Sequence, residues 1–485
     1  MNPLIQVKQT TSVFLIAFGL TCFGLSPAVR AVNPAPDGGY PGMNTAEGHN
    51  ALFSLTTGQD NTAVGFDALL NNNSNNNTAM GAKTLVRNTI GSSNTANGAF
   101  SLFNNTIGSF NTASGFQTLT SNTTGNFNTA VGTDALSLNT TGDANTATGD
   151  AALADNRTGF DNTATGVSAL LHNTTGNDNT ATGLQALSLN TTGFFNTATG
   201  SLALNNNTTG NDNTATGVNA LSVNRTGNNN TADGYQALRN NTTGGLNTAV
   251  GIDALARNIT GNHNCGVGGA ALLSNTTGSF NIAIGTNAGS NLTTGSHNID
   301  IGSGGTMGES HTMRIGTEQQ TSTFVTGIYG ATVASGVPVQ INSNNRLGTM
   351  TSSKRFKEEI KPVDKASEML FSLKPVSFRY KKDIDPKGVS QFGLVAEDVE
   401  KVNSALVVHD KEGRPYSVRY DQVNAMLLNE FLKEHRTVEE QQATIAQLKR
   451  DSAEHWKQIE RLTAGLQKVN AQLEANKSTP QVVTN

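Results

Sequence analysis

The sequence predicts a mainly β protein: a parallel β-solenoid or β-roll of repeats, then a small α+β domain, then a C-terminal coiled coil. Three observations predict this order. A motif recurs every 17 residues between 61 and about 302, most Lys and Arg residues follow residue 350, and apolar residues return at heptad spacing from Phe431 to Leu473. We expect the solenoid to be trimeric.

Residues 1–31 are predicted to be a secretory signal peptide. Lys8 supplies a weak positive start, and the apolar run Val13–Leu25 is too short to span a bilayer. Small residues favour cleavage after Ala31; an uncleaved N-terminal anchor is the alternative. Cys22 lacks the small preceding residue of a lipidation site. We therefore expect a secreted or cell-surface protein with no transmembrane span after signal removal.

Residues 32–60 are predicted to be a linker, and residues 61–302 a repeat array. The motif Asn-Thr-Ala-x-Gly, with three degenerate copies at the end, recurs at a step of 17 residues after a first step of 16. Its copies begin at Asn61, Asn77, Asn94, Asn111, Asn128, Asn145, Asn162, Asn179, Asn196, Asn213, Asn230, Asn247, Asn264, Asn281 and Asn298. Such regular spacing indicates a repeat architecture and argues against a disordered Asn/Thr/Gly-rich tract.

Each repeat has the composition of one solenoid coil. Two short segments of small apolar residues are separated by Gly and by an Asn-Thr-Thr-Gly turn, and 17 residues are too few for a helix pair. Equivalent Asn side chains are expected to form ladders between coils, and Gly to supply positive φ at corners. Most coils contain one bulky apolar residue, such as Leu136 or Leu187, so we expect the Leu rows of three chains to pack together.

Composition excludes several function classes for the array. A net charge of −4 gives no general basis for binding nucleic acid. Cys265 replaces a repeat Thr and is expected to be a small packed side chain; with only His263 nearby, no metal site is expected, and no cofactor motif occurs. The array contains no Glu and its Asp residues recur at no fixed position, which gives no support to a glycan-degrading enzyme. A host-surface or glycan ligand remains a possible partner.

The array resembles the head repeats of trimeric autotransporter adhesins, which stack shorter Ala-x-Gly units. The resemblance implies a similar architecture and association of three copies of the chain.

Residues 303–351 are predicted to be an irregular β junction, after which a second resemblance begins. Leu347-Gly348-Thr349 is followed by Ser352-Ser353-Lys354-Arg355-Phe356-Lys357, and further motifs lie at 373–380, 391–399 and 416–420. Over about 345–450 the chain resembles the intramolecular chaperone of phage endosialidase tailspikes, the S74 peptidase family, which implies a self-cleaving trimerisation domain at 352–430. The signal peptide disfavours a phage origin.

The resemblance implies a catalytic Ser352 and Lys357, because family members cut their own backbone with a Ser/Lys dyad at this spacing. A Ser hydroxyl needs a base, and Lys can serve once desolvation or neighbouring cations such as Lys354 and Arg355 lower its pKa. Many members carry Asp after the nucleophile, whereas this chain has Ser353, which is a rival nucleophile. A retained chaperone that does not cleave is the alternative.

The rest of the C-terminal third is expected to be α+β, with helices capped by Asp364 and Asp421 and a coiled coil at 431–475. Residues 476–485 are expected to be a disordered tail. Heptad positions a are Phe431, Val438, Ile445, Ser452, Ile459, Leu466 and Leu473, and positions d are Gln441, Leu448, His455, Leu462 and Val469. Polar residues in this seam would weaken the coiled coil and fix the register of its helices. The resemblance implies that three helices associate.

Together these features predict an exported trimeric surface fibre, or an adhesin-like protein, whose C-terminal domain guides assembly and cleaves at Ser352. A permanently attached trimerisation domain and a glycan-binding or glycan-degrading spike are the alternatives.

Overall fold

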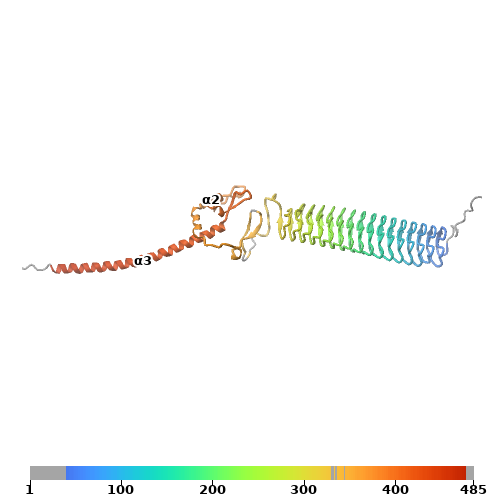
Figure 1. The fold of residues 1–485 in the computed structure, drawn as a ribbon, viewed down its shortest axis with the longest axis horizontal. Coiled ribbons are helices and arrows are strands. Elements are labelled where there is room, and N and C mark those ends of the chain that lie inside the picture. Colours follow the sequence, from blue (N-terminus) through green and yellow to red (C-terminus); the bar gives the residue numbers. More distant parts are fainter. Residues whose placement is uncertain (1–39, 329–332, 334–335, 343, 477–485) are drawn as a thin grey trace, which may run out of the picture. The chain divides into compact units, whose positions relative to one another are not determined.

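The computed structural model describes residues 40–328, 333, 336–342 and 344–476. The chain divides into two compact units, one ending at Phe324 and the other beginning at Val325. Figure 1 shows a stack of coils in the first unit and a long helix in the second. The predicted signal peptide and all but the first residue of the predicted tail lie outside the described residues.

The first unit is a parallel β-solenoid, as predicted, and each coil adds one short strand to a single sheet of 17 strands. Neighbouring strands pair in parallel with equivalent repeat residues opposite each other, as in Thr180↔Thr197. The strands are Thr45–Glu47 (β1), Thr62–Val64 (β2), Thr78–Met80 (β3), Thr95–Asn97 (β4), Thr112–Ser114 (β5), Thr129–Val131 (β6), Thr146–Thr148 (β7), Thr163–Thr165 (β8), Thr180–Thr182 (β9), Thr197–Thr199 (β10), Thr214–Thr216 (β11), Thr231–Asp233 (β12), Thr248–Val250 (β13), Cys265–Val267 (β14), Ile282–Ile284 (β15), Ile299–Ile301 (β16) and Met313–Ile315 (β17).

The solenoid is longer than the predicted array at both ends. Asn44-Thr45-Ala46-Glu47-Gly48 is a further copy of the motif, and β1 pairs with β2 in the repeat register. The predicted linker 32–60 is therefore corrected, since its residues from Asn44 onward form the first coil. At the other end β17 pairs with β16, so the start of the predicted junction completes the last coil.

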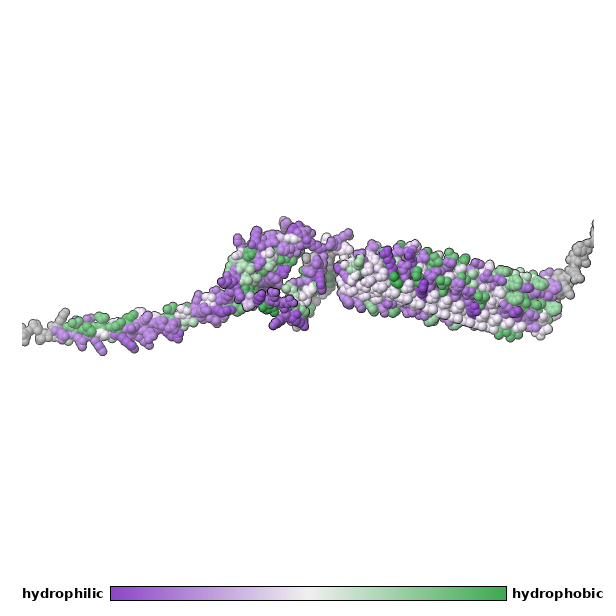
Figure 2. Space-filling view, in the orientation of Figure 1, coloured by the Kyte–Doolittle hydropathy of each residue, from purple (hydrophilic) through white to green (hydrophobic). Residues whose placement is uncertain are grey.

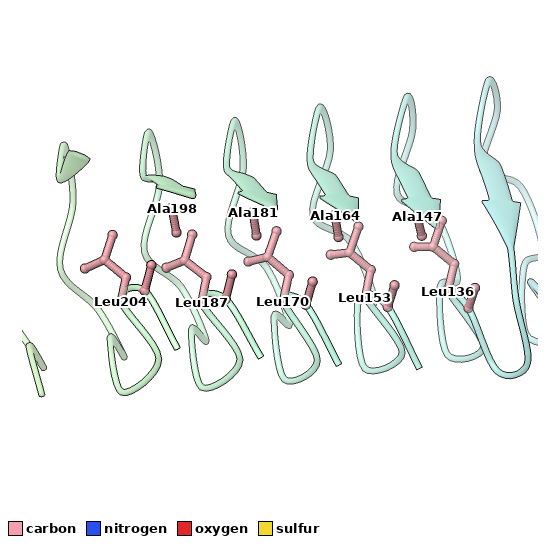
Figure 3. Packing of buried hydrophobic residues seen from close by; sticks show 14 of the residues in the cluster. Leu136, Ala147, Leu153, Ala164, Leu170, Ala181, Leu187, Ala198 and Leu204 are labelled. Carbon is pink, nitrogen blue, oxygen red and sulfur yellow. The ribbon is translucent and has the colours of Figure 1, made fainter. Parts of the chain in front are cut away.

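The coil Asn179–Phe195 shows how the repeat fills its interior. The middle residue of its strand, Ala181, points inward and is fully buried, whereas Thr180 and Thr182 point outward. Ala186 and Leu187 complete the core and are also fully buried. Figure 3 shows the same Leu and Ala side chains stacked in rows from coil to coil.

The expectation that the Leu rows pack across a threefold axis is therefore wrong. Their side chains, including Leu136, Leu170 and Leu204, are already fully buried inside one chain. The coil is narrow enough that one Leu facing two Ala residues fills it, so a thin core does not require a second chain.

A ladder of Asn side chains joins the coils, as the sequence predicted. Asn179 Nδ2 donates to Asn162 Oδ1 of the preceding coil at 3.1 Å and to the Gly193 carbonyl of its own coil at 2.9 Å. Asn179 Oδ1 in turn accepts from the backbone and side-chain N–H groups of Asn196. The buried amide of Asn179 therefore has its hydrogen bonds satisfied by its own coil and by the two adjacent coils.

A second Asn ladder begins at the Asn-Thr-Thr-Gly turn. Asn190 Nδ2 donates to Asn173 Oδ1 at 2.8 Å and to the Gly193 carbonyl at 2.9 Å. Asn179 and Asn190, from opposite parts of one coil, thus share one carbonyl acceptor. This shared acceptor fixes the length of chain between the two ladders.

Two glycines are required in each coil for different reasons. Gly183 has φ +137, and a Cβ there would lie 2.6 Å from the Gly200 carbonyl oxygen. Gly193 has no positive φ, but a Cβ would lie 2.4 Å from Asn190 Oδ1 and 2.5 Å from the Gly210 carbonyl oxygen. The first glycine provides the corner, as predicted, while the second allows the coils to approach closely.

Left-handed backbone also occurs at residues with side chains, which the sequence did not indicate. Gln185 has φ 54 and Leu187 has φ 52, and equivalent residues recur in other coils. Such a conformation costs about 1–2 kcal/mol per residue. It turns the chain sharply enough that consecutive Ala186 and Leu187 both point inward, and their burial offsets the cost.

The last two strands of the solenoid, β16 and β17, carry charged residues at the middle position, where most other strands have Ala. Asp300 occupies the inward position of β16, is 1% exposed, and has no hydrogen-bond partner for either carboxyl oxygen among the described residues. Arg314 is paired with it in register on β17 and binds the Glu309 carboxylate with contacts of 2.6–3.0 Å. Burial, together with the negative charge of Glu309, raises the pKa of Asp300 from 3.8 to about 6.

The second unit contains three antiparallel strand pairs, one short α-helix, several 3₁₀ turns and one long helix. Its elements are Val339–Ile341 (β18), Leu347–Thr349 (β19), Lys354–Phe356 (η1), Asp364–Ser372 (η2), Val376–Phe378 (β20), Gln391–Gly393 (β21), Ala396–Val402 (α2), Ser404–Leu406 (η3), Val407–His409 (β22), Pro415–Val418 (β23) and Tyr420–Ala475 (α3). The strand pairs β18–β19, β20–β21 and β22–β23 are antiparallel. Strands and helices both occur in this unit, but the two predicted Asp caps are wrong: Val363 and Arg419 occupy the N-cap positions.

Substitution of one ladder residue tests whether the amides hold the coils together. Asn179→Ala should destabilise the solenoid by about 2–3 kcal/mol, because it leaves buried polar groups of Asn162, Asn196 and Gly193 with fewer partners. Asn206→Ala is the matched control, because Asn206 is half-buried and its side chain forms no hydrogen bond within the described residues. Unfolding in urea is measured by circular dichroism. Equal urea midpoints for the two variants would contradict the stabilising role of the ladder.

The buried Asp300 predicts a pH-dependent stability. Between pH 3.8 and about 6 the folded protein retains a proton that the unfolded chain has lost, so the free energy of unfolding should fall as pH rises through this range. Asp300→Ala restores the repeat residue and should stabilise the solenoid at pH 7.5 by about 1–2 kcal/mol. The gain should shrink at pH 4, and Asp150→Ala, at an exposed position, is the matched control. A gain that is the same at both pH values would contradict the assignment.

Candidate assembly and self-cleavage site

The predicted dyad lies on a short segment after the β18–β19 hairpin. Ser352 precedes the single 3₁₀ turn Lys354–Phe356, and Lys357 follows it. The turn forms because the amides of Phe356 and Lys357 donate to the carbonyls of Ser353 and Lys354, both at 3.1 Å. The two residues therefore flank one tight turn.

In the single chain the dyad is not assembled. Ser352 and Lys357 are both exposed, and no side-chain hydrogen bond joins them in the described part of the chain. The rival Ser353 is also exposed, and its side chain does not cap the turn. Of the two flanking cations, Arg355 lies over the Phe356 ring, with its guanidinium carbon 4.7 Å from the ring centroid.

The structure does bring together another Ser and Lys, which the sequence did not indicate. Ser367 on η2 is fully buried; its Oγ accepts from Asn429 Nδ2 at 2.7 Å and donates to the Glu430 carboxylate on α3. Lys433 Nζ lies 3.4 Å from this Oγ and 2.7 Å from Glu430. These partners are more than 60 residues apart in sequence, so no local pattern could have identified them.

This cluster fastens η2 to α3 and does not form a nucleophile–base pair. The hydrogen bond to Glu430 raises the pKa of Lys433, so the lysine stays protonated and cannot act as a general base. The same contact, followed by that of Ser367, lowers the pKa of Glu430. The cluster therefore fixes where the long helix leaves the rest of the unit.

A second contact holds the start of α3. The hydroxyl of Tyr420, the first residue of the helix, accepts from the Leu394 amide at 3.0 Å. A Cβ at Gly393 would lie 3.0 Å from this hydroxyl and 3.1 Å from the Phe378 ring. The glycine in the motif at 391–399 is thus needed because Tyr420 and Phe378 pack closely against it.

The second unit has a small core and a large exposed apolar surface. Its fully buried apolar cluster consists of Val399, Leu406, Val407 and Val418. Phe371, Phe392 and Tyr416, by contrast, are each more than 75% exposed. In a monomer these side chains remain in contact with water, which opposes folding of the isolated unit.

The long helix α3 likewise leaves its seam uncovered. Side chains at both a and d positions are exposed, for example Ile459 at 51% and Leu462 at 64%. A shallow groove lined by Ile445, Leu448, Ser452 and Trp456, among others, runs along the same part of the helix. Figure 2 shows hydrophobic residues along one side of this helix and hydrophilic residues along the other.

With this geometry described, the chain can be compared with known proteins. Residues 352–408 match the Peptidase_S74 family, chaperone of endosialidase. The match begins at Ser352 and confirms the resemblance noted for this segment, while the repeat array lies outside it. No curated protein and no solved structure matches the chain.

Other kinds of site were sought in the described ranges. No three His, Cys, Asp or Glu side chains there are grouped so that they could hold a metal ion. No helix among the described residues is both long and apolar enough to cross a membrane. Cys265 is a half-buried free thiol on the outward side of β14.

Proposed function

We propose that this protein is an exported fibre whose S74 segment assembles three copies of the chain and then cuts itself from the solenoid. The observation that carries the proposal is the combination of the S74 match with an apolar surface that a single chain leaves exposed. A chaperone that acts by bringing chains together needs such a surface, because its burial drives association.

Self-association would complete the second unit. The helix α3, with 56 residues at 1.5 Å per residue, is about 84 Å long, and its exposed seam is long enough for several heptads of helix–helix contact. The Ser367–Glu430–Lys433 cluster would hold each helix at one angle to its own unit, so that three helices meet in a common register. The family resemblance supports three copies.

Association would also supply what the dyad lacks in the single chain. Burial of Lys357 among the cations of three chains would favour its neutral form, which can accept the Ser352 hydroxyl proton. Ser352 Oγ then attacks the Thr351 carbonyl carbon, the proton passes to the departing Ser352 nitrogen, and an ester joins the two residues. Water hydrolyses the ester to a Thr351 carboxylate and a free Ser352.

Release of the chaperone would make the fibre kinetically stable. Once the segment from Ser352 onward is lost, the element that guides assembly is absent, and loss of the assembled state is limited by its unfolding rate. A retained, non-cleaving chaperone is the second candidate. The exposure of Ser352 and Lys357, with no hydrogen bond between them among the described residues, favours it.

Charges introduced into the seam test association. In a Ser352→Ala full-length chain, light scattering should give a trimer, and Leu448→Asp with Leu462→Asp should reduce it to monomers or make it insoluble, because buried unpaired charges oppose helix packing. Ala446→Asp with Ala464→Asp, on the opposite side of the heptad, should remain trimeric. A folded monomer of the unsubstituted seam would refute the proposal.

Substitutions at the dyad test cleavage. Wild-type protein should give two bands on a denaturing gel, whereas Ser352→Ala, Lys357→Ala and Lys357→Arg should slow cleavage by about 100-fold or more, because each removes the nucleophile or the base. Ser353→Ala is the matched control and should still cleave.

Mass spectrometry of the fragments identifies the bond. A C-terminal fragment beginning at Ser352 agrees with the proposal, and one beginning at Ser353 identifies the following bond instead. Cleavage in both dyad variants would exclude the dyad, and an uncut wild-type trimer would favour the retained chaperone.

A further inference from the structure

The outward face of the strands changes character along the solenoid. In β7–β11 both outward positions of every strand are Thr, as in Thr163 and Thr165. In the last four strands the outward residues are instead Cys265, Val267, Ile282, Ile284, Ile299, Ile301, Met313 and Ile315. We call these eight residues the apolar strand face.

The parallel register gathers this face into two continuous rows. Val267, Ile284, Ile301 and Ile315 are paired from strand to strand, and the other four residues form the neighbouring row. With strands about 4.8 Å apart, the rows make a flat apolar surface on one side of the sheet. None of the eight residues is charged, and the nearest charged outward residue along the strands is Asp233 on β12.

These eight apolar residues are explained neither by a preference for β-branched residues in strands nor by a need to fill the core of the solenoid. Thr is β-branched like Ile and Val, so the Thr strands already satisfy the preference for β-branched residues in sheets. The inward position of each strand, not the outward ones, forms the core, and Ile284 and Ile315 are 46% and 68% exposed. Apolar side chains left in water at eight adjoining positions indicate a surface that is covered in the assembled protein.

We propose that the apolar strand face packs against the same end of the solenoid in a second copy of this chain. This inference rests on the proposed function, because the S74 segments hold the copies together. Only residues 316–351 separate β17 from that segment, so the last coils are the part of the array with the highest effective concentration around one another. An uncharged face suits its own copy, since it needs no partner of opposite charge.

The position of Cys265 within this face provides a direct test. The full chain carries Cys22→Ser and Ser352→Ala, so that it stays whole and Cys265 is its one thiol. A short bismaleimide should cross-link Cys265 between copies, giving a dimer band on a denaturing gel. The matched control moves the thiol to the Thr face at the same strand position, as Cys265→Thr with Thr163→Cys, and should cross-link far less.

A second pair of variants tests the apolar contact itself. Ile284→Thr with Ile301→Thr restores the residues of the middle coils and should lower the yield of Cys265 cross-links by about tenfold or more, because apolar burial is lost in every copy. Val131→Thr makes the same kind of change on β6, where Val131 is 41% exposed, and should leave the yield unchanged.

Light scattering on the same samples separates the two proposals. If the protein is a trimer but Cys265 cross-links no better than the control thiol, this inference is overturned while the proposed function stands. A trimer in which Cys265 reacts readily with a monofunctional maleimide but forms no cross-link would mean that the face is open to water, which also overturns the inference. A monomer throughout would overturn the proposed function.

Discussion

The buried asparagines fix the length of chain between the two ladders in each coil, because one Asn of each ladder donates to the same backbone carbonyl. Asn179 and Asn190 both reach Gly193, and each also bonds to its counterpart one coil earlier. An inserted or deleted residue between them would break contacts in its own coil and in the next. In the coil that is one residue shorter, Ser74 supplies the shared carbonyl instead, so both ladders continue.

The two units place their apolar residues in opposite ways. In the solenoid, Leu187 and its equivalents are sealed inside one chain, so the coils have no need of a partner for their core. In the second unit the buried cluster is small and the seam of α3 faces water. The apolar surfaces that remain open to another chain therefore lie in the C-terminal unit and where the repeat departs from its usual residues.

Departures from the repeat are concentrated at the C-terminal end of the solenoid. There the inward Ala becomes Asp300, whose charge is disfavoured by burial, and the outward Thr residues become Ile and Val. In an array of identical coils the last coil would present the same unpaired edge as any other, so further coils could be added to it without limit. The changed residues make the last coils different from the rest of the array, and they form the face that we propose packs against another copy.

The sequence by itself determined the period, the parallel stacking of coils, the Asn ladders and the glycine corners, because each depends on residues that recur at a fixed spacing. It also identified the S74 segment from its motifs. Only the tertiary structure decided that Leu187 closes the core within one chain. Its inward direction depends on left-handed backbone at Gln185 and Leu187, and these residue types do not predict such a conformation. The same holds for Ser367, Glu430 and Lys433, and for the exposed, separate positions of Ser352 and Lys357 in the single chain, because contacts between distant segments leave no periodic trace in the sequence.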